Sequence, residues 1–384
     1  MGKFRIYKDG YIESVQNIES DSRYGFNQPI DKLYIGQNRV KKVCKGSTLL
    51  MDGTDTSIYR YFYMYAVNAG GGTVSLQNNG NNAPDIEYSR DGVNWTTWDY
   101  SAIALYYTAP DDYSDTVIYP VFFRGSNPNG FNSSSSKYSK FAFSTGTKVV
   151  LGGNIMSLID KTNFNTLETL PASYCFYSLF SQQSAVYSCK GLSFDGVLVN
   201  PDIESLYNLQ LPATTLTSNC YHNMFWGSTS MIDAPVLPAT TLTQSCYQGM
   251  FADCSSLINA PGLPAKTAAI SCYQNMFTNC TFSIAPALPA TTLAQYCYRE
   301  MFSATHNITS QIELPATDLA SGCYYQMFYY SSVNNIKCLA ETNINTTNLY
   351  SWLSSSTGTF VKKTGVTFPS GKSGIPNGWT VEEI

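Results

Sequence analysis

The chain has 384 residues, of which 13% are charged, 43% are hydrophobic and 29 are tyrosine. Its 27 acidic and 23 basic residues leave a net charge of −4, which is too small to attract a nucleic acid or an anionic membrane. The sequence has no run of about 18 apolar residues. We therefore expect no nucleic-acid partner and no membrane insertion.

Residues 1–48 are expected to form a β module. The segment KLYIGQNRVKKVCKGSTLL places apolar residues around Gly36 and Gly46, which predicts two strands joined by a turn. It resembles a short β motif of structural proteins in tailed phages, and this resemblance implies attachment to a virus particle. An ordinary hairpin is the alternative. The N-terminus lacks the apolar core of a secretory signal, so we expect none.

Residues 49–150 are expected to form a β-sandwich. Segments such as IYRYFYMYAV, TVIYPVFFRG and KFAFSTGTKVVL alternate in strand fashion and are separated by short turn signals. A hairpin turn at Asp91-Gly92 precedes Trp95 and Trp98. Exposed aromatic residues on sandwiches often bind sugars, but we expect these two tryptophans to be core or edge residues.

The rest of the chain repeats itself. The triplet Leu-Pro-Ala recurs at intervals of 41, 26, 26, 25 and 26 residues, starting at Leu170. From the second copy onward, a Cys-Tyr pair follows nine residues after the leucine, and Met-Phe follows after two variable residues. A period of this length predicts a solenoid, because one unit buries its apolar face only against its neighbours.

Within one unit, TTLTQSCYQGMF fits one face of a short helix, and SSLINAPGL is expected to be extended as far as Pro261. The apolar positions that fit the helix are Leu242, Cys246, Tyr247, Met250 and Phe251. Stacking in register would place each repeated cysteine above the last as a buried, reduced, structural thiol. This cysteine ladder consists of Cys220, Cys246, Cys272, Cys297 and Cys323.

The repeated pattern CYxxMFxxCxSLxxAPxLPATTL is similar to the BspA-type leucine-rich repeats found in surface proteins of gut anaerobes and their phages. The resemblance covers Leu170 to Val333 and implies binding or adhesion rather than catalysis. It implies a leucine-rich-repeat solenoid over residues 151–335 and a C-terminal cap over residues 336–384. The expected fold class is α+β and multidomain: an all-β N-terminal region of hairpin module and sandwich, then the solenoid and its cap.

We expect no enzyme activity, catalytic residue, cofactor or metal site. The chain has only His222 and His306, both expected to face solvent, and no nucleophile elbow, P-loop or zinc-protease motif. Its cysteines form no C-x-x-C pair, so a metal site is not indicated. The acidic pair Asp111-Asp112 is explained best as a solvated turn. A glycan-cleaving carboxylate pair contributed by separate loops stays open.

Positions that differ between copies of the repeat are free of its packing demands and are the candidate binding surface. Large or charged side chains at these positions can stack on sugars or anchor a protein contact. The candidates are His222, Trp226, Arg299, Tyr325, Tyr329 and Tyr330. The alternative for the three tyrosines is packing against the C-terminal cap or another subunit.

These observations favour a virion structural protein, a head- or tail-fibre component of a tailed phage. Residues 1–48 would mount it on other virion proteins, with a homotrimer as one arrangement, and the solenoid would bind a glycan or protein of the host surface. Such a protein would be assembled in the host cytoplasm and released by lysis. The alternatives are a bacterial cell-surface adhesin of BspA type and a capsule depolymerase.

Overall fold

The computed structural model describes residues 60–68, 70–81, 83–106, 120–190 and 208–384, and before them the backbone of six strands. The chain divides into two compact units. One contains Met1–Ile58 and Leu192–Ser205, and the other contains Tyr59–Gly191 and Leu206–Ile384.

The strands of the first unit form antiparallel pairs. Strands β5 and β6 pair on either side of Gly46, within a sheet of order β2-β1-β5-β6, and β3 pairs with β4 on either side of Gly36. Strands therefore occur around both glycines, in two separate pairs. Their bounds are β1 Lys3–Lys8, β2 Tyr11–Asn17, β3 Tyr34–Ile35, β4 Asn38–Arg39, β5 Lys42–Lys45 and β6 Thr48–Asp52. The side chains of this module lie outside the described residues.

The second unit begins with two facing sheets. One has the strand order β10-β9-β12-β7-β14-β15, with β16 also paired to β14, and the other has the order β11-β8-β13. Their bounds are β7 Phe62–Ala66, β8 Gly72–Asn79, β9 Ile86–Ser89, β10 Thr96–Thr97, β11 Ile103–Leu105, β12 Val121–Gly125, β13 Tyr138–Phe143, β14 Val149–Asn154, β15 Val186–Ser188 and β16 Leu209–Gln210.

Aromatic side chains fill the space between these sheets. Phe141 of β13 lies 5.7 Å from Phe62 of β7 and 5.5 Å from Phe123 of β12, measured between ring centroids. The indole of Trp98 is buried against Phe123 at 5.4 Å. Trp95 lies at an edge, where the Arg124 guanidinium covers its ring at 4.0 Å.

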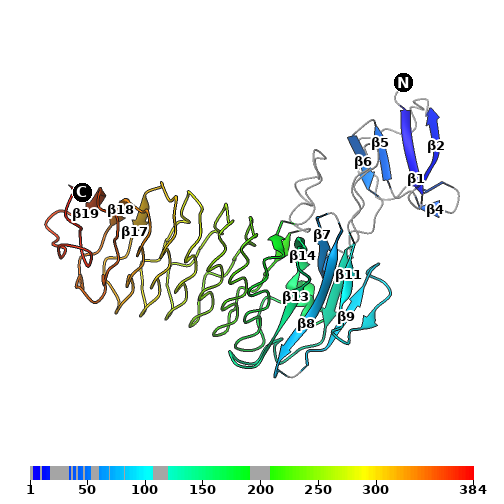
Figure 1. Ribbon diagram of the computed structural model, residues 1–384, viewed down its shortest axis with the longest axis horizontal. Coiled ribbons are helices and arrows are strands. Elements are labelled where there is room, and N and C mark those ends of the chain that lie inside the picture. Colours follow the sequence, from blue (N-terminus) through cyan, green and yellow to red (C-terminus); the bar gives the residue numbers. More distant parts are fainter. Residues whose placement is uncertain are drawn as a thin grey trace. The chain divides into compact units, whose positions relative to one another are not determined.

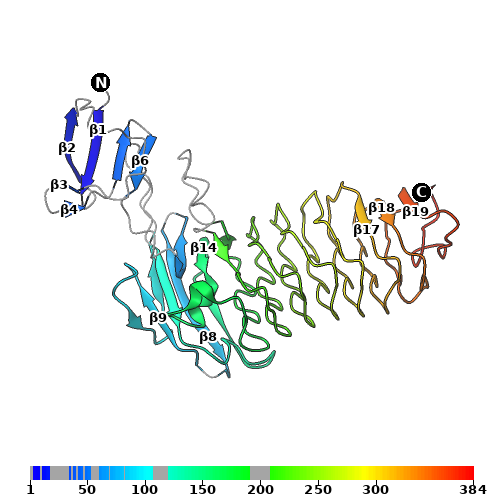
Figure 2. The ribbon, with the colours of Figure 1, turned by 180° about the vertical axis from the view of Figure 1, so that it is seen from behind.

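Beyond the sandwich, the chain winds into successive coils that stack side by side (Figure 1), and the view from behind shows the same stack (Figure 2). Two columns of stacked rings run through their interior. One column has centroid spacings of 5.6–6.2 Å and consists of Phe176, Tyr221, Tyr247, Tyr273, Tyr298 and Tyr324. The other has spacings of 5.5–5.8 Å and consists of Phe180, Phe225, Phe251, Phe277, Phe302 and Phe328.

The sandwich and the coils share one apolar core. Phe141 stacks on Phe180 of the first coil at 5.4 Å, and its backbone N–H donates to the carbonyl of Leu179. Strand β14 pairs in parallel with β15. At the other end, Trp352 packs against Tyr324 and Phe328, so that one indole covers both columns.

The prediction of a short helix in each unit is wrong, and so is the α+β class that depended on it. The chain is nearly all β. The segment from Asn219 to Gly227, and its counterpart in every coil, is a run of tight turns that we call the turn segment. Its residues at every fourth position, Asn219, Asn223 and Gly227, have positive φ, which an α-helix excludes. Two short 3₁₀-helices follow strand β14, η2 Ile155–Leu158 and η3 Phe164–Thr166.

Backbone hydrogen bonds explain why the turn segment repeats so regularly. Alternate N–H groups close turns within the coil, as from Met224 to the carbonyl of Tyr221. The intervening N–H groups donate to the next coil, as from Tyr221 to the carbonyl of Cys246. Buried backbone groups are thus paired without helix or regular strand.

The remaining part of each coil is extended, as expected, but pairs through isolated bridges such as Asp233 with Asn259. Among the described coils, regular strands form beside the sandwich, as β15 and β16, and again toward the C-terminus, where a parallel sheet of order β17-β18-β19-β20 completes a β-solenoid. These strands are β17 Ile312–Leu314, β18 Asn335–Cys338, β19 Gly358–Lys362 and β20 Trp379–Glu383. The Trp379 indole donates to the carbonyl of Ser355 at 2.9 Å.

Candidate binding surface

The turn segment places its side chains in alternating pairs. Cys-Tyr and Met-Phe point into the core, as Cys246, Tyr247, Met250 and Phe251 do with at most 1% of their surface exposed. The two residues after each inward pair form the outer edge of the coil and are partly exposed in most coils. The candidate binding residues lie on this edge.

One row of outer side chains runs along the stacked coils. It is formed by the residue directly after the inward Cys-Tyr pair or its equivalent, and each member ends in a flat group. We call it the planar row: Tyr177, His222, Gln248, Gln274, Arg299, Tyr325 and Tyr350. The backbone bonds between coils fix its members one coil apart.

The first end of the planar row is aromatic. The ring of Tyr177 lies 5.2 Å from the imidazole of His222. The rings of Tyr138 and Tyr174 lie within 5.7 Å of the Tyr177 ring. The imidazole Nδ1 lies 3.2 Å from Oδ1 of Asn219. His222 was expected to face solvent, but it is only partly exposed. Burial lowers its pKa to about 4. His306 is exposed.

The second end of the planar row combines a cation with rings. The Arg299 guanidinium lies 4.9 Å from the ring of Tyr325, which stacks on Tyr350 at 4.8 Å. The ring of Tyr296 lies 5.5 Å from the same guanidinium. Arg299 Nε donates to Glu300 at 2.9 Å, so the positive charge is paired.

Tyr329 and Tyr330 follow the Met-Phe pair of the same coil as Tyr325. Their ring centroids are 4.2 Å apart, and 67% of the surface of Tyr330 is exposed. A hydrogen bond that the Tyr329 hydroxyl donates to the Tyr330 side chain raises the pKa of the Tyr329 phenol. Unlike the inward aromatic residues, these rings are not required by the stacking of coils.

Trp226 has a structural contact as well as an outer position. Its indole Nε1 donates to Asp253 Oδ2 at 2.7 Å, and the same carboxylate accepts from Asn279 Nδ2 at 2.9 Å. The side chains of three successive coils are thereby linked. Trp226 is partly exposed, and its polar atom already has a protein partner.

The cysteine ladder lies in the interior. Cys220, Cys246, Cys272, Cys297 and Cys323 have no exposed surface, and the ten cysteines among the described side chains are free thiols. Burial raises the pKa of Cys246 and Cys297 to about 12. A thiol that retains its proton in this way is a poor nucleophile and a poor metal ligand.

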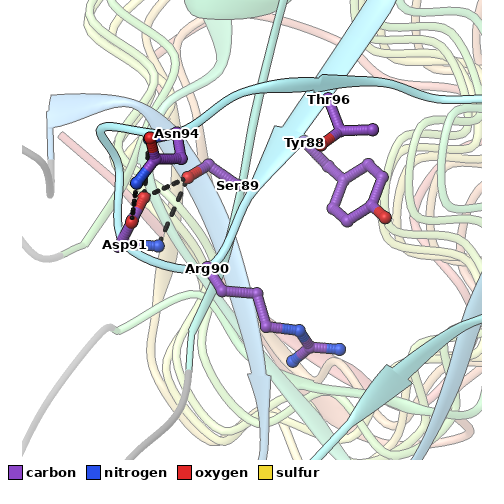
Figure 3. Close-up of a pocket in the computed structure, with 6 residues that line it drawn as sticks. All are labelled: Tyr88, Ser89, Arg90, Asp91, Asn94 and Thr96. Carbon is purple, nitrogen blue, oxygen red and sulfur yellow. Dashed lines mark hydrogen bonds between the residues drawn. The ribbon is translucent and has the colours of Figure 1, made fainter.

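A hollow on the described surface lies beside the hairpin of residues 88–96 (Figure 3). The Asp91 carboxylate turns back onto its own loop, where it accepts hydrogen bonds from the N–H groups of Val93 and Asn94 and from the hydroxyl of Ser89. These bonds lower the pKa of Asp91. The carboxylate therefore stabilises a turn.

The described residues contain no group of three or more His, Cys, Asp or Glu side chains arranged to hold a metal ion. Within the same part of the chain, no helix has the length and hydrophobicity needed to cross a membrane. Asp111-Asp112 lies outside the described residues.

Three members of this surface were not among the residues predicted from the sequence: Tyr177, Tyr296 and Tyr350. Tyr177 and Tyr350 lie in coils whose inward pair is Cys175-Phe176 or Asn348-Leu349 rather than Cys-Tyr. Aligning these degenerate coils by their outer positions would have shown a tyrosine at each end of the row. Comparison with models of protein families, with curated proteins and with solved structures finds no match to this chain.

Proposed function

We propose that this chain is a surface-binding protein, a head- or tail-fibre component of a tailed phage whose solenoid binds the host surface. The observation that supports this proposal most strongly is the planar row, in which flat side chains follow one another at the spacing of the coils. Such a row suits a repeating or extended ligand, because each coil offers an equivalent contact.

The chemistry of the row supports binding. Tyr and His are flat groups with two side-chain torsions, so they make large contacts while losing few degrees of freedom, and Tyr and Arg are enriched among residues that dominate binding energy. The row is held by hydrogen bonds between coils, so little ordering is needed when a ligand binds. The resemblance of the repeat to BspA-type repeats, and of residues 1–48 to phage structural proteins, supports the class of protein.

The test is binding of fluorescently labelled protein to host cells. A variant carrying Tyr177→Gln, His222→Gln, Arg299→Gln and Tyr325→Gln extends the glutamines of Gln248 and Gln274 along the row. We expect it to fold like the parent and to bind cells at least tenfold more weakly. The control substitutes glutamine at the exposed solenoid residues Val236, Ile258 and Ile284 and should bind like the parent.

Equal binding by the row variant and the parent would show that the adhesive surface lies elsewhere. Electron microscopy of phage particles with an antibody to this chain tests the virion role, and labelling of bacterial cells without phage would favour the adhesin. Oligosaccharide released from host capsule by the protein would favour the depolymerase.

A further inference from the structure

Four tyrosine rings gather where the planar row reaches the last regular coils. Tyr325 and Tyr350 belong to the planar row, and Tyr329 and Tyr330 follow the Met-Phe pair of the same coil as Tyr325. Tyr330 is 67% exposed and Tyr350 is 46% exposed, so two large rings remain largely open to solvent. We call these four residues the tyrosine patch.

The solenoid does not need rings at these positions. In the preceding coil, the residues equivalent to Tyr329 and Tyr330 are Ser303 and Ala304, and Ala304 has the same left-handed backbone conformation as Tyr330. Packing therefore gives no reason for two tyrosines here. Exposed rings gathered at one place on a polar surface mark an interaction site.

The backbone holds the patch rigidly. The N–H of Gln326 donates to the carbonyl of Tyr350 at 2.8 Å, and the N–H of Tyr330 donates to the hydroxyl of Ser354 at 2.8 Å. The carbonyl of Tyr329 accepts from the N–H of Ala304 at 2.7 Å. With the backbone fixed in this way, only the two side-chain torsions of each ring remain to be ordered when a ligand binds.

The surroundings of the patch are polar but carry balanced charge. Arg299 is paired with Glu300, and the side chain of Arg299 keeps 35% of its surface exposed. The run Ser354–Thr357 adds hydroxyl groups beside Tyr330. A sugar ring has apolar C–H faces and hydroxyl groups around its edge. The tyrosine rings suit its faces, and the hydroxyl and guanidinium groups beside them suit its hydroxyls. The paired charges favour an uncharged sugar over an acidic one.

We propose that the tyrosine patch is the stacking subsite for an uncharged sugar residue of a surface glycan. The proposal rests on the function proposed above and narrows it to one ligand class and one end of the solenoid. Tyr330 and Tyr350 supply the exposed ring faces. Arg299 and the serine run supply polar contacts.

The test compares the parent with a Tyr329→Ser and Tyr330→Ala double variant, which reproduces Ser303 and Ala304 of the preceding coil. Binding is measured by titration against neutral and acidic polysaccharides purified from the host. Loss of one aromatic stacking partner weakens binding about three- to tenfold, so the double variant, which removes the exposed ring of Tyr330 but leaves Tyr350, should bind the neutral polysaccharide about three- to tenfold more weakly. Tyr330→Phe retains the ring and should bind within about threefold of the parent.

Tyr106→Ala removes a tyrosine that is 56% exposed on the sandwich and should leave binding unchanged.

If the parent binds host cells but the double variant binds equally well, the patch is not the subsite and the proposed function stands. If the parent does not bind host cells, the proposed function itself fails. Preference for the acidic polysaccharide, or binding to cells that protease abolishes and periodate leaves intact, overturns the sugar assignment. Dimerisation of the parent that the double variant lacks would identify a second copy as the occupant and overturn it too.

Discussion

Each cysteine of the ladder occupies a position where one coil meets the next. Its thiol is removed from water, and the proton stays on sulfur because a buried thiolate would lose its solvation. The repetition of cysteine therefore has a packing explanation: the position takes a small, apolar side chain.

This burial predicts thiol reactivity. We expect the ten thiols with described side chains to resist a thiol reagent such as DTNB at pH 8 in the native protein and to react after unfolding. Because the thiol pKa values are raised in the fold, the thiols of the unfolded chain ionise at a lower pH than those of the native protein. Stability should then fall as pH rises above about 8.5, by about 1.4 kcal/mol per pH unit for each thiol that ionises on unfolding. Rapid native labelling of several thiols would contradict this account.

The stability of the fold should also depend on pH through His222, but here stability falls as the pH falls. Its pKa is lowered to about 4 in the fold, so the unfolded chain takes up a proton between about pH 6.5 and 4 and the native state does not. Stability should fall by up to about 3 kcal/mol over that interval. His222→Gln, which copies Gln248, should flatten this part of a plot of urea midpoint against pH. An unchanged plot would show that His222 is not responsible.

At the scale of the element, the sequence indicates the repeat but not the backbone path. The 26-residue period predicted stacked units, because an isolated unit cannot bury its apolar face. Apolar pairs four residues apart fit both a helix and a run of four-residue turns, and the helical interpretation was wrong. The distinguishing signal is the residue at every fourth position, but only in some coils, since Tyr296, Glu300 and Ala304 occupy the same positions in another. Asn219, Asn223, Gly249 and Asp253 are residue types that tolerate positive φ.

The left-handed positions can be tested by substitution. Ser271 has φ of 51°, and its equivalent in an earlier coil is Asn219. Ser271→Asn should leave stability unchanged or slightly higher, while Ser271→Val should cost about 1–2 kcal/mol, because a β-branched side chain is strained in this conformation. Urea unfolding monitored by circular dichroism measures both. Equal stability of the two variants would contradict the role of the left-handed turn.

The candidate surface was only partly predictable for a related reason. Trp226, Arg299 and Tyr325 could be identified as outer residues by aligning the Cys-Tyr repeats. Tyr350 could not, because its coil lacks that pair and Trp352 replaces the inward methionine. The contact between Trp226 and Asp253 also depends on how two coils are placed side by side.

At the scale of the molecule, the second unit is a one-dimensional stack closed at both ends. The sandwich covers the first coil through Phe141, and Trp352 covers the last aromatic pair. Stability of such a stack is approximately a sum over coils and the contacts between them.

Removing one whole coil should therefore be tolerated. Deletion of residues 237–262 removes one 26-residue period and joins equivalent positions. The shortened protein should remain folded and lose about 1–4 kcal/mol, the share of a segment of this length. Deletion of residues 237–249 removes half a period, interrupts both aromatic columns and should prevent folding. Calorimetry and near-ultraviolet circular dichroism distinguish these outcomes, and loss of folding in both deletions would rule out independent coils.

The hydrogen bonds between turn segments all run in one direction, since each coil donates N–H groups to the carbonyls of the coil that follows it. The peptide dipoles of the turn segments therefore point the same way, with partial positive charge toward the C-terminal end, while bonds of the extended parts, as from the N–H of Ile258 to the carbonyl of Ile232, run the other way. This polarity is opposite to that of an α-helix, whose N-terminus is the positive end. Acidic groups are therefore favoured beside the turn segment of the last coil.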